Sequence, residues 1–340
     1  MTRKKNVKKE VYENLEETQE EESNKKIGST GKIITAIFLV CLIAAIALIG
    51  IFVYGLINPE SQVLRLKNYN SLAETQAAVN ASGELKQFVT NLRFNHNDIS
   101  YYMSPDCSAT KKTRFENALF LISDKTKIIN FYLTNEKDAD ILVGCSKDSY
   151  EQEKNVFIAG EGGPTEYLDL KVYPVIKKGK VLLYEESNCD YPVTELHELL
   201  HVFGFDHINN SKLLLYPYIK CDQSIPPEAI EALIKLYSVQ PAAELYFSNA
   251  SAVKTGMYLN FKIQINNDGM IKAEEVVLEV YADDEKIEVE NLKDIDFGTG
   301  QGFYVNNLKL PSANAKNIRF RTITSTNEFD KTDNSIELSV

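Results

Sequence analysis

One apolar run stands out in the hydrophobic pattern of the chain. Residues 33–57 contain no charged side chain. A helix of this length would extend for about 37 Å at 1.5 Å per residue, enough to cross a bilayer with some tilt. We therefore predict a single transmembrane helix at 33–57, preceded by a disordered, charged cytoplasmic tail at 1–32. A buried soluble helix or a cleavable signal peptide fits less well, because the run is long and follows a charged tail.

The charges that flank this run predict its orientation. Lys25, Lys26 and Lys32 precede it, whereas Glu60 follows it closely. By the positive-inside rule, the N-terminus is expected in the cytoplasm and the rest of the chain outside it. The expected location is thus the cell membrane, with one crossing, and residues 58–91 are predicted to form a stalk.

The pattern beyond the stalk changes once along the chain. Up to about residue 240, segments with apolar residues at helical spacing are mixed with short apolar runs typical of strands. The predicted helices are 108–126 and 226–238, and the predicted strands are 93–103, 127–133, 138–145 and 179–186. This mixture predicts an α+β domain at 92–240. Residues 241–340 alternate apolar and polar positions between turn signals, which is typical of an all-β sandwich of some seven antiparallel strands.

Three of the four histidines lie in the short window TELHELLHVFGFDH. His197 and His201 are four residues apart, so they share one face of a helix predicted at roughly 192–203. This spacing lets both imidazoles reach one zinc ion. His207 can join them only if the helix ends after His201, and Gly204 can adopt the left-handed conformation that ends a helix.

The residue next to the first histidine completes a catalytic pattern. Three neutral histidines leave the fourth tetrahedral position of zinc to water, as in catalytic sites. Glu198 points about 100° round the helix from His197 and can take a proton from that water, whose pKa zinc lowers towards ~7. A lone pair of helical histidines is more often a surface or core feature, but the complete pattern favours a zinc hydrolase.

The window HELLHVFGFDH resembles the extended zinc motif of the metzincins, HExxHxxGxxH. The downstream SKLLLYP resembles the Met-turn of their matrixin branch. The resemblance implies that Zn²⁺ is bound by His197, His201 and His207, and that Glu198 is the general base. It also implies that Leu215 lies in the floor of the site, where the family carries methionine.

The rest of the chain adds weaker resemblances. The order of elements over 92–240 is similar to that of the matrixin catalytic domain, which implies a metzincin-like mixed sheet with an active-site helix. Residues 241–340 resemble the CARDB-type immunoglobulin-like modules of extracellular proteins, which space or bind and carry no chemistry. A second metal site is not expected, because the remaining histidine, His96, is predicted to be a surface residue.

Charge and cysteine content narrow the class of partner and the compartment. The net charge of −11 argues against nucleic acid, since phosphate binding needs a basic surface. Four cysteines follow the apolar run, and their even number suggests two disulfides with three possible connectivities; four buried thiols are the alternative. Of the three connectivities we expect Cys189–Cys221 together with Cys107–Cys145.

These features together predict a membrane-anchored zinc endopeptidase that acts on proteins or peptides outside the cytoplasm. The alternative is a non-catalytic adhesion or scaffold protein with a vestigial metzincin domain. The presence of Glu198 favours the enzyme, because a decayed site has no reason to keep its base. No cysteine lies in residues 58–91, so latency through a thiol bound to zinc is not expected.

Overall fold

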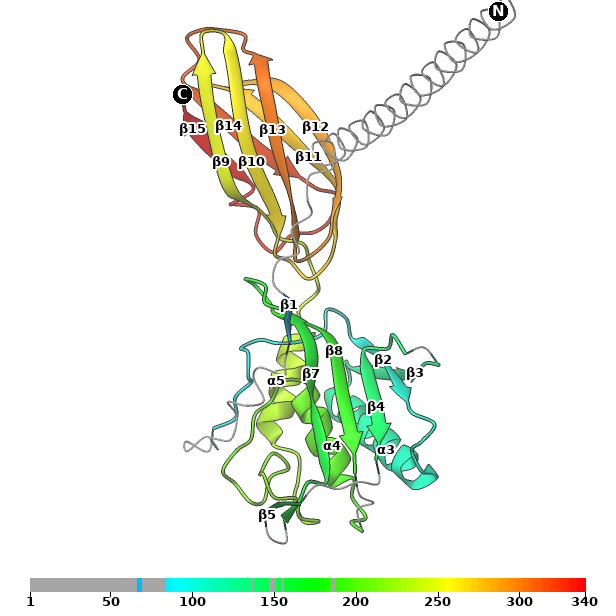
Figure 1. The fold of residues 1–340 in the computed structure, drawn as a ribbon. Helices are drawn as coiled ribbons and strands as arrows, with labels where there is room; N and C mark the ends of the chain where they lie inside the picture. The colour runs from blue at the N-terminus through cyan, green and yellow to red at the C-terminus, as the bar shows by residue number, and fades with distance from the viewer. Residues whose placement is uncertain (1–65, 69–83, 136, 147–150, 154–155, 185–187) are drawn as a thin grey trace, which may run out of the picture. The chain divides into compact units, whose positions relative to one another are not determined.

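The computed structural model of the chain describes residues 66–68, 84–135, 137–146, 151–153, 156–184 and 188–340 (Figure 1). All of these belong to one compact unit, Ser61–Val340. The segments predicted as cytoplasmic tail and transmembrane helix, residues 1–32 and 33–57, lie outside the described residues, as does most of the predicted stalk.

The first part of the unit is built on a six-stranded mixed sheet in the order β1-β7-β8-β4-β2-β3 (Figure 1). Its strands are β1 (Leu66–Asn68), β2 (Asp98–Met103), β3 (Asn130–Leu133), β4 (Ile141–Cys145), β7 (Gly160–Leu168) and β8 (Val175–Leu183). Strands β3, β2, β4 and β8 are parallel neighbours, whereas β7 runs antiparallel to β8. β1 pairs antiparallel with only the last residues of β7, Glu166–Leu168. A separate small sheet joins β5 (Glu151–Glu153) to β6 (Val156–Phe157).

Three helices accompany this sheet: α3 (Ala109–Thr126), α4 (Val193–Val202) and α5 (Pro227–Tyr237). α3 begins where the Ser108 side chain accepts a hydrogen bond from the Lys111 N–H, and it ends at Lys127, whose φ is 61°. It buries Phe115, Leu119 and Ile122 at helical spacing. In Figure 1 the strands β7, β8 and β4 stand in front of α4 and α5. These elements lie within a few residues of the ranges predicted from periodicity.

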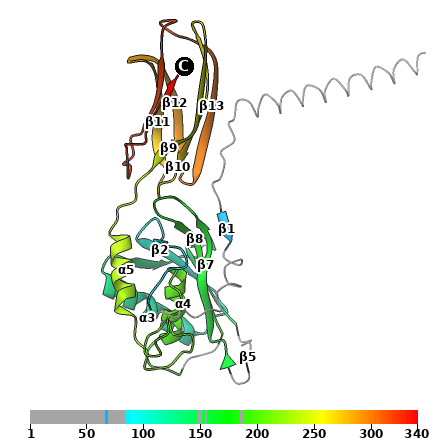
Figure 2. The same cartoon turned by 90° about the vertical axis from the view of Figure 1, so that its left-hand side faces the viewer.

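The chain after α5 forms seven antiparallel strands in two sheets, one of three strands (β13-β10-β9) and one of four (β12-β11-β14-β15). The strands are β9 (Leu245–Thr255), β10 (Tyr258–Asn267), β11 (Ala273–Ala282), β12 (Glu285–Ile295), β13 (Thr299–Lys309), β14 (Asn317–Ile323) and β15 (Ser335–Ser339). The sheets lie face to face (Figure 2) and share one buried core, in which the Phe261 and Phe320 rings are 4.9 Å apart. Alternating apolar residues face this core, as period-two patterning requires.

The fold class predicted from the sequence is wrong. It combined an α+β metzincin-like domain and an immunoglobulin-like sandwich with one transmembrane helix, whereas the described residues contain fifteen strands and only three helices. None of the described helices is both long and apolar enough to cross a membrane. The prediction gave too much weight to helical segments, because the chemistry-bearing motif lies on one of them. Alternating and β-branched runs, which favour strands, occupy far more of the described chain.

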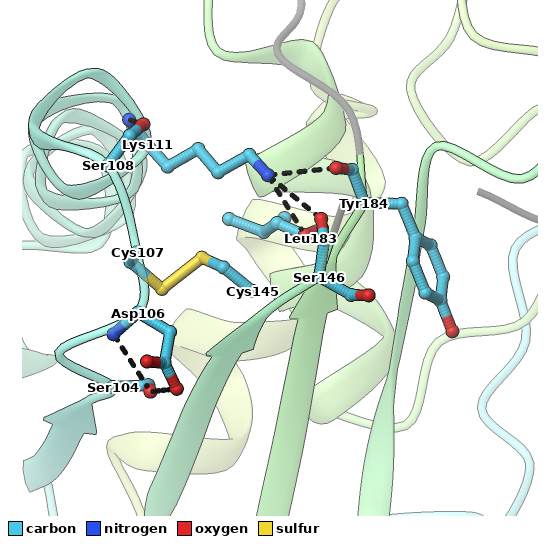
Figure 3. The surroundings of a disulfide bond; sticks show 9 residues. All are labelled: Ser104, Asp106, Cys107, Ser108, Lys111, Cys145, Ser146, Leu183 and Tyr184. Carbon is cyan, nitrogen blue, oxygen red and sulfur yellow. Dashed lines mark hydrogen bonds between the residues drawn. A yellow bond between two sulfur atoms is a disulfide. The ribbon is translucent and has the colours of Figure 1, made fainter. Parts of the chain in front are cut away.

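Two disulfides are present, Cys107–Cys145 and Cys189–Cys221, as expected. The first joins the segment before α3 to the end of β4 (Figure 3). Beside it, the buried Lys111 ammonium donates to the carbonyl oxygens of Ser146, Leu183 and Tyr184, at 3.3, 3.3 and 2.8 Å. The disulfide and the lysine together hold the start of α3 against the carboxyl ends of β4 and β8.

The second disulfide gives a stability prediction. Replacing Cys189 and Cys221 together by serine should lower the free energy of unfolding by roughly 3–4 kcal/mol, because the bond closes a loop with a sequence separation of 32. Urea unfolding of the two chains without reductant measures the difference. Peptide mapping without reduction is the control for pairing, and a peptide joining Cys107 to Cys189 would contradict the assignment.

Candidate metal centre

Helix α4 carries the first two predicted ligands and confirms the helix predicted at this position. Every residue of α4 is buried, because the helix lies directly on β7 and β8. A Cβ at Gly162 of β7 would overlap the main-chain oxygen of Glu198, and one at Gly179 of β8 would lie 2.6 Å from Val202 Cγ1. Glycine at these two strand positions is what allows the helix to come so close.

The structure brings the three predicted ligand histidines to one point. The Nε2 atoms of His197 and His201 are 3.0 Å apart, and each is 3.2 Å from Nε2 of His207. Nitrogen ligands at 2.0–2.1 Å from a tetrahedral zinc ion are separated by roughly 3.3–3.4 Å, close to this triangle. Among the residues that the structure describes, these three are the one group of histidine, cysteine, aspartate or glutamate with such convergence. They could therefore hold a metal ion.

Backbone carbonyls decide which nitrogen of each helical histidine faces this point. His197 Nδ1 contacts the Leu214 oxygen, and His201 Nδ1 lies 2.6 Å from the Phe205 oxygen. A carbonyl oxygen only accepts, so each Nδ1 carries the proton and each Nε2 presents a lone pair. Lone pairs brought to 3.0 Å repel one another unless a cation lies among them. The donor set thus fits a metal ion, with the outer partners that metal-binding histidines usually have.

The third histidine arrives through a turn at the end of α4. Gly204 has a φ of 84°, and a Cβ there would lie 2.9 Å from Leu92 Cδ2. Both facts favour glycine, as predicted from the spacing of the window. The Asp206 carboxylate then accepts a hydrogen bond from the His207 N–H at 2.7 Å, which orients the backbone of the ligand.

Burial keeps these histidines neutral. Loss of hydration lowers the pKa of His197 to about 4, with a further contribution from His207, and lowers the pKa of His201 well below its usual value. The pKa of His207 is lowered as well, again by burial. Neutral imidazole is the form that binds a metal, so at neutral pH the ligands need not lose a proton before they bind.

Glu198 lies buried against the first residue of β7. A Cβ at Gly160 would lie 2.8 Å from Glu198 Cγ, so the carboxyl group fills the space that this glycine leaves. Burial raises the pKa of Glu198 to about 8, with further contributions from Glu161 and Glu195. Glu161 itself accepts a hydrogen bond from the Tyr184 hydroxyl at 2.6 Å. A cation at the neighbouring histidines would favour the carboxylate form of Glu198.

A buried ion pair fixes the start of α4. Arg114 on α3 contacts Glu195 in the first turn of α4, with Nε and Oε1 2.9 Å apart and both side chains largely buried. The same guanidinium donates to the carbonyl oxygens of Cys189 and Tyr191. A carboxylate in the first turn is favourable there because it faces the positive end of the helix dipole. α3 thereby sets the position of the helix that carries the ligands.

The remaining predicted site residues lie as follows. Leu215 is fully buried, and its carbonyl accepts a hydrogen bond from the N–H of Ile208, the residue after the third ligand. The neighbouring carbonyl, that of Leu214, holds His197. His96 is bound to Asp140, with Nε2 and Oδ2 3.1 Å apart, and is not part of the histidine group.

Sequence reasoning missed several residues around the centre. Arg114 on α3 and Glu161 on β7 lie beside α4 but in other segments, and no periodicity links them to it. Glu195 lies within α4, but nothing in the window marks it as the partner of Arg114. Residues 84–91, predicted as part of the stalk, also contact the centre: the Phe88 ring stacks on the His201 ring with centroids 6.0 Å apart. The only local signal for this contact was the apolar spacing of Leu85, Phe88 and Val89.

Comparisons with known proteins give little further information. No family model and no curated protein sequence matches the chain. Among solved structures, a CARDB domain from Pyrococcus furiosus, solved in complex with di-metal ions, is similar at 11% identity, covering 29% of this chain and 87% of that one. Its TM-score of 0.24 marks a distant likeness.

The glycine contact between β7 and α4 can be tested by adding one methyl group. Gly162→Ala should lower the free energy of unfolding by about 1–3 kcal/mol and weaken metal binding, because the Cβ overlaps the main chain of α4. Gly302→Ala is the matched control, since the nearest atom to its Cβ is 3.9 Å away. Urea unfolding and zinc titration of both variants measure the effect. Equal stability of the two variants would contradict the contact.

Proposed function

We propose that this protein is a zinc-dependent endopeptidase, related in its active-site chemistry to the metzincins of the matrixin type. The observation that carries the proposal is the convergence of three neutral imidazole Nε2 atoms beside the buried carboxyl group of Glu198. The sequence motif HExxHxxGxxH supports zinc over other metals, because this spacing is typical of catalytic zinc.

The roles of the residues follow from their places in the site. His197, His201 and His207 would hold the ion. When bound, zinc would polarise a peptide carbonyl and lower the pKa of a water molecule towards ~7. Glu198 accepts a proton from the attacking water and later donates it to the leaving amine. A cation at the histidines would favour the carboxylate form of Glu198, which is the form that accepts a proton.

The edge of the sheet supports a peptide as substrate. Among the described residues, β1 covers β7 only at Glu166–Leu168, so the outer edge from Gly160 to Thr165 has no strand paired with it. An extended peptide can add to such an edge through main-chain hydrogen bonds. Gly160 lies against Glu198, so a peptide on this edge would pass the catalytic carboxyl group.

The compartment and the second part of the chain complete the proposal. Two disulfides indicate an oxidising environment, which supports action outside the cytoplasm. We assign no chemistry to residues 241–340, and propose that they space the catalytic part or bind a partner. The net charge of −11 supports a protein or peptide substrate over nucleic acid.

The general base is tested by separating metal binding from hydrolysis. Glu198→Ala should keep zinc, because this carboxyl group is not a ligand, but should lower the rate of peptide hydrolysis by at least a hundredfold. His201→Ala should lose zinc and activity together. Zinc content by atomic absorption and cleavage of casein by the full chain measure the two properties.

The same experiment separates the enzyme from an adhesion or scaffold protein. A wild-type chain that binds zinc but cleaves neither casein nor gelatin would favour the non-catalytic alternative. Hydrolysis by Glu198→Ala at the wild-type rate would contradict the proposed mechanism even if the protein is an enzyme.

The position where matrixins carry methionine gives a further prediction. Leu215→Met should change turnover less than threefold and leave zinc binding intact, because Leu215 is fully buried and leucine and methionine differ little in volume. Leu214 and Leu215 contact His197 and Ile208 through their main-chain oxygens, which the substitution keeps. Zinc titration and cleavage kinetics check it. An inert wild type that gained strong proteolysis from this change alone would contradict the packing role.

A further inference from the structure

The second and third histidines are separated by a turn, which is joined to α4 where the Gly204 and Phe205 N–H groups donate to the oxygens of His201 and Leu200. Residues 86–88, which we call the strap, run along this turn. The Phe88 N–H donates to the Gly204 oxygen at 2.7 Å, and the Asp206 N–H donates to the Lys86 oxygen at 2.9 Å. Between these two bonds, Gln87 and Phe205 face each other as an antiparallel bridge. Three consecutive strap residues thus contact three consecutive residues of the turn.

The Gln87 side chain extends the strap to the end of α4. Its Nε2 donates to the Phe203 oxygen at 2.9 Å and to the Leu92 oxygen at 2.8 Å, so both protons of the amide are used. Phe203 is the C-cap residue of α4, where carbonyls lack intrahelical partners. The Leu92 side chain in turn occupies the space beside Gly204 that a Cβ would need. One amide therefore joins the helix end to the segment that packs on the turn.

The strap also touches a ligand directly. The Phe88 and His201 rings are stacked, with an interplanar angle of 22° and centroids 6.0 Å apart. His201 donates from Nδ1 to the oxygen of Phe205, the residue that Gln87 faces. The contacts of the strap therefore reach both sides of the gap between His201 and His207.

We propose that the strap sets the position of His207 relative to the other two ligands, and that Gln87 is the positioning residue. A ligand on a turn must be placed within a few tenths of an ångström for its metal bond to form at full strength. Local hydrogen bonds to α4 hold the turn only as far as Phe205. The N–H of Asp206, the residue before His207, instead donates to the Lys86 oxygen of the strap, which lies more than a hundred residues away in the sequence. The inference rests on the proposed metal site but not on the proposed reaction.

The test measures zinc affinity of the full, disulfide-bonded chain by competition with a chelator. Gln87→Met keeps the length of the side chain and removes both donors, and it should weaken zinc binding by 10- to 100-fold, the range seen when partners behind metal ligands are lost. Gln87→Glu has the same shape and can donate at most one hydrogen bond, and only when protonated; it should also weaken zinc binding and serves as the second variant. Lys86→Ala is the matched control. The Lys86 side chain is exposed and only its main-chain oxygen contacts the turn, so the zinc affinity of this variant should stay within twofold of the wild type.

A double-mutant cycle distinguishes positioning of His207 from general destabilisation. In a His207→Ala background, Gln87→Met should weaken zinc binding by less than twofold, because the ligand that it positions is gone. The same 10- to 100-fold loss in both backgrounds, or no loss in the chain that retains His207, would overturn the proposal. The absorption bands of bound Co²⁺ should also change for Gln87→Met and remain unchanged for Lys86→Ala. No substrate enters these measurements, so a failure of the peptidase proposal would leave their result intact.

Discussion

The contact between α4 and the glycine-rich start of β7 is the constraint on which the site depends. Because Gly160 and Gly162 have no side chains, the helix rests on the strand, and Glu198 fills the space above Gly160. The same contact buries both helical histidines and places the start of β7 beside the carboxyl group of Glu198. Arg114 holds the beginning of α4 through Glu195, so the helix is fixed from a second direction.

Burial then determines the chemical state of the centre. Removing His197 and His201 from water lowers their pKa values, while main-chain carbonyls take the Nδ1 protons. The result is a set of lone pairs directed at one point, which a cation would stabilise. The same desolvation raises the pKa of Glu198, because a negatively charged carboxylate is unfavourable where it is removed from water. One physical cause, loss of hydration, thus shifts the pKa values of the histidines and of Glu198 in opposite directions.

The errors of sequence reasoning have a common physical origin. The fold class was wrong because the pattern of a single helix carried most of the chemistry, whereas the described residues contain fifteen strands and three helices. Residues 84–91 were predicted to belong to a stalk, part of it a helix packed on the catalytic domain, and their apolar spacing does not say which surface of that domain they meet. Which surface they meet depends on contacts between residues far apart in the chain, such as that of Gln87 with Phe203. Local periodicity does not contain that information.

The sequence by itself determined the candidate ligands, because four residues in a helix bring two side chains to one face whatever surrounds them, and glycine permits the turn that follows. It also indicated two disulfides through an even number of cysteines. Only the tertiary structure decided which segments contact His207 and its turn, what fixes the helix and which part of the β7 edge is unpaired among the described residues. Each of these depends on segments separated by 70 residues or more, as Arg114 is from Glu195. Their meeting depends on how the whole core packs, which no short window of sequence specifies.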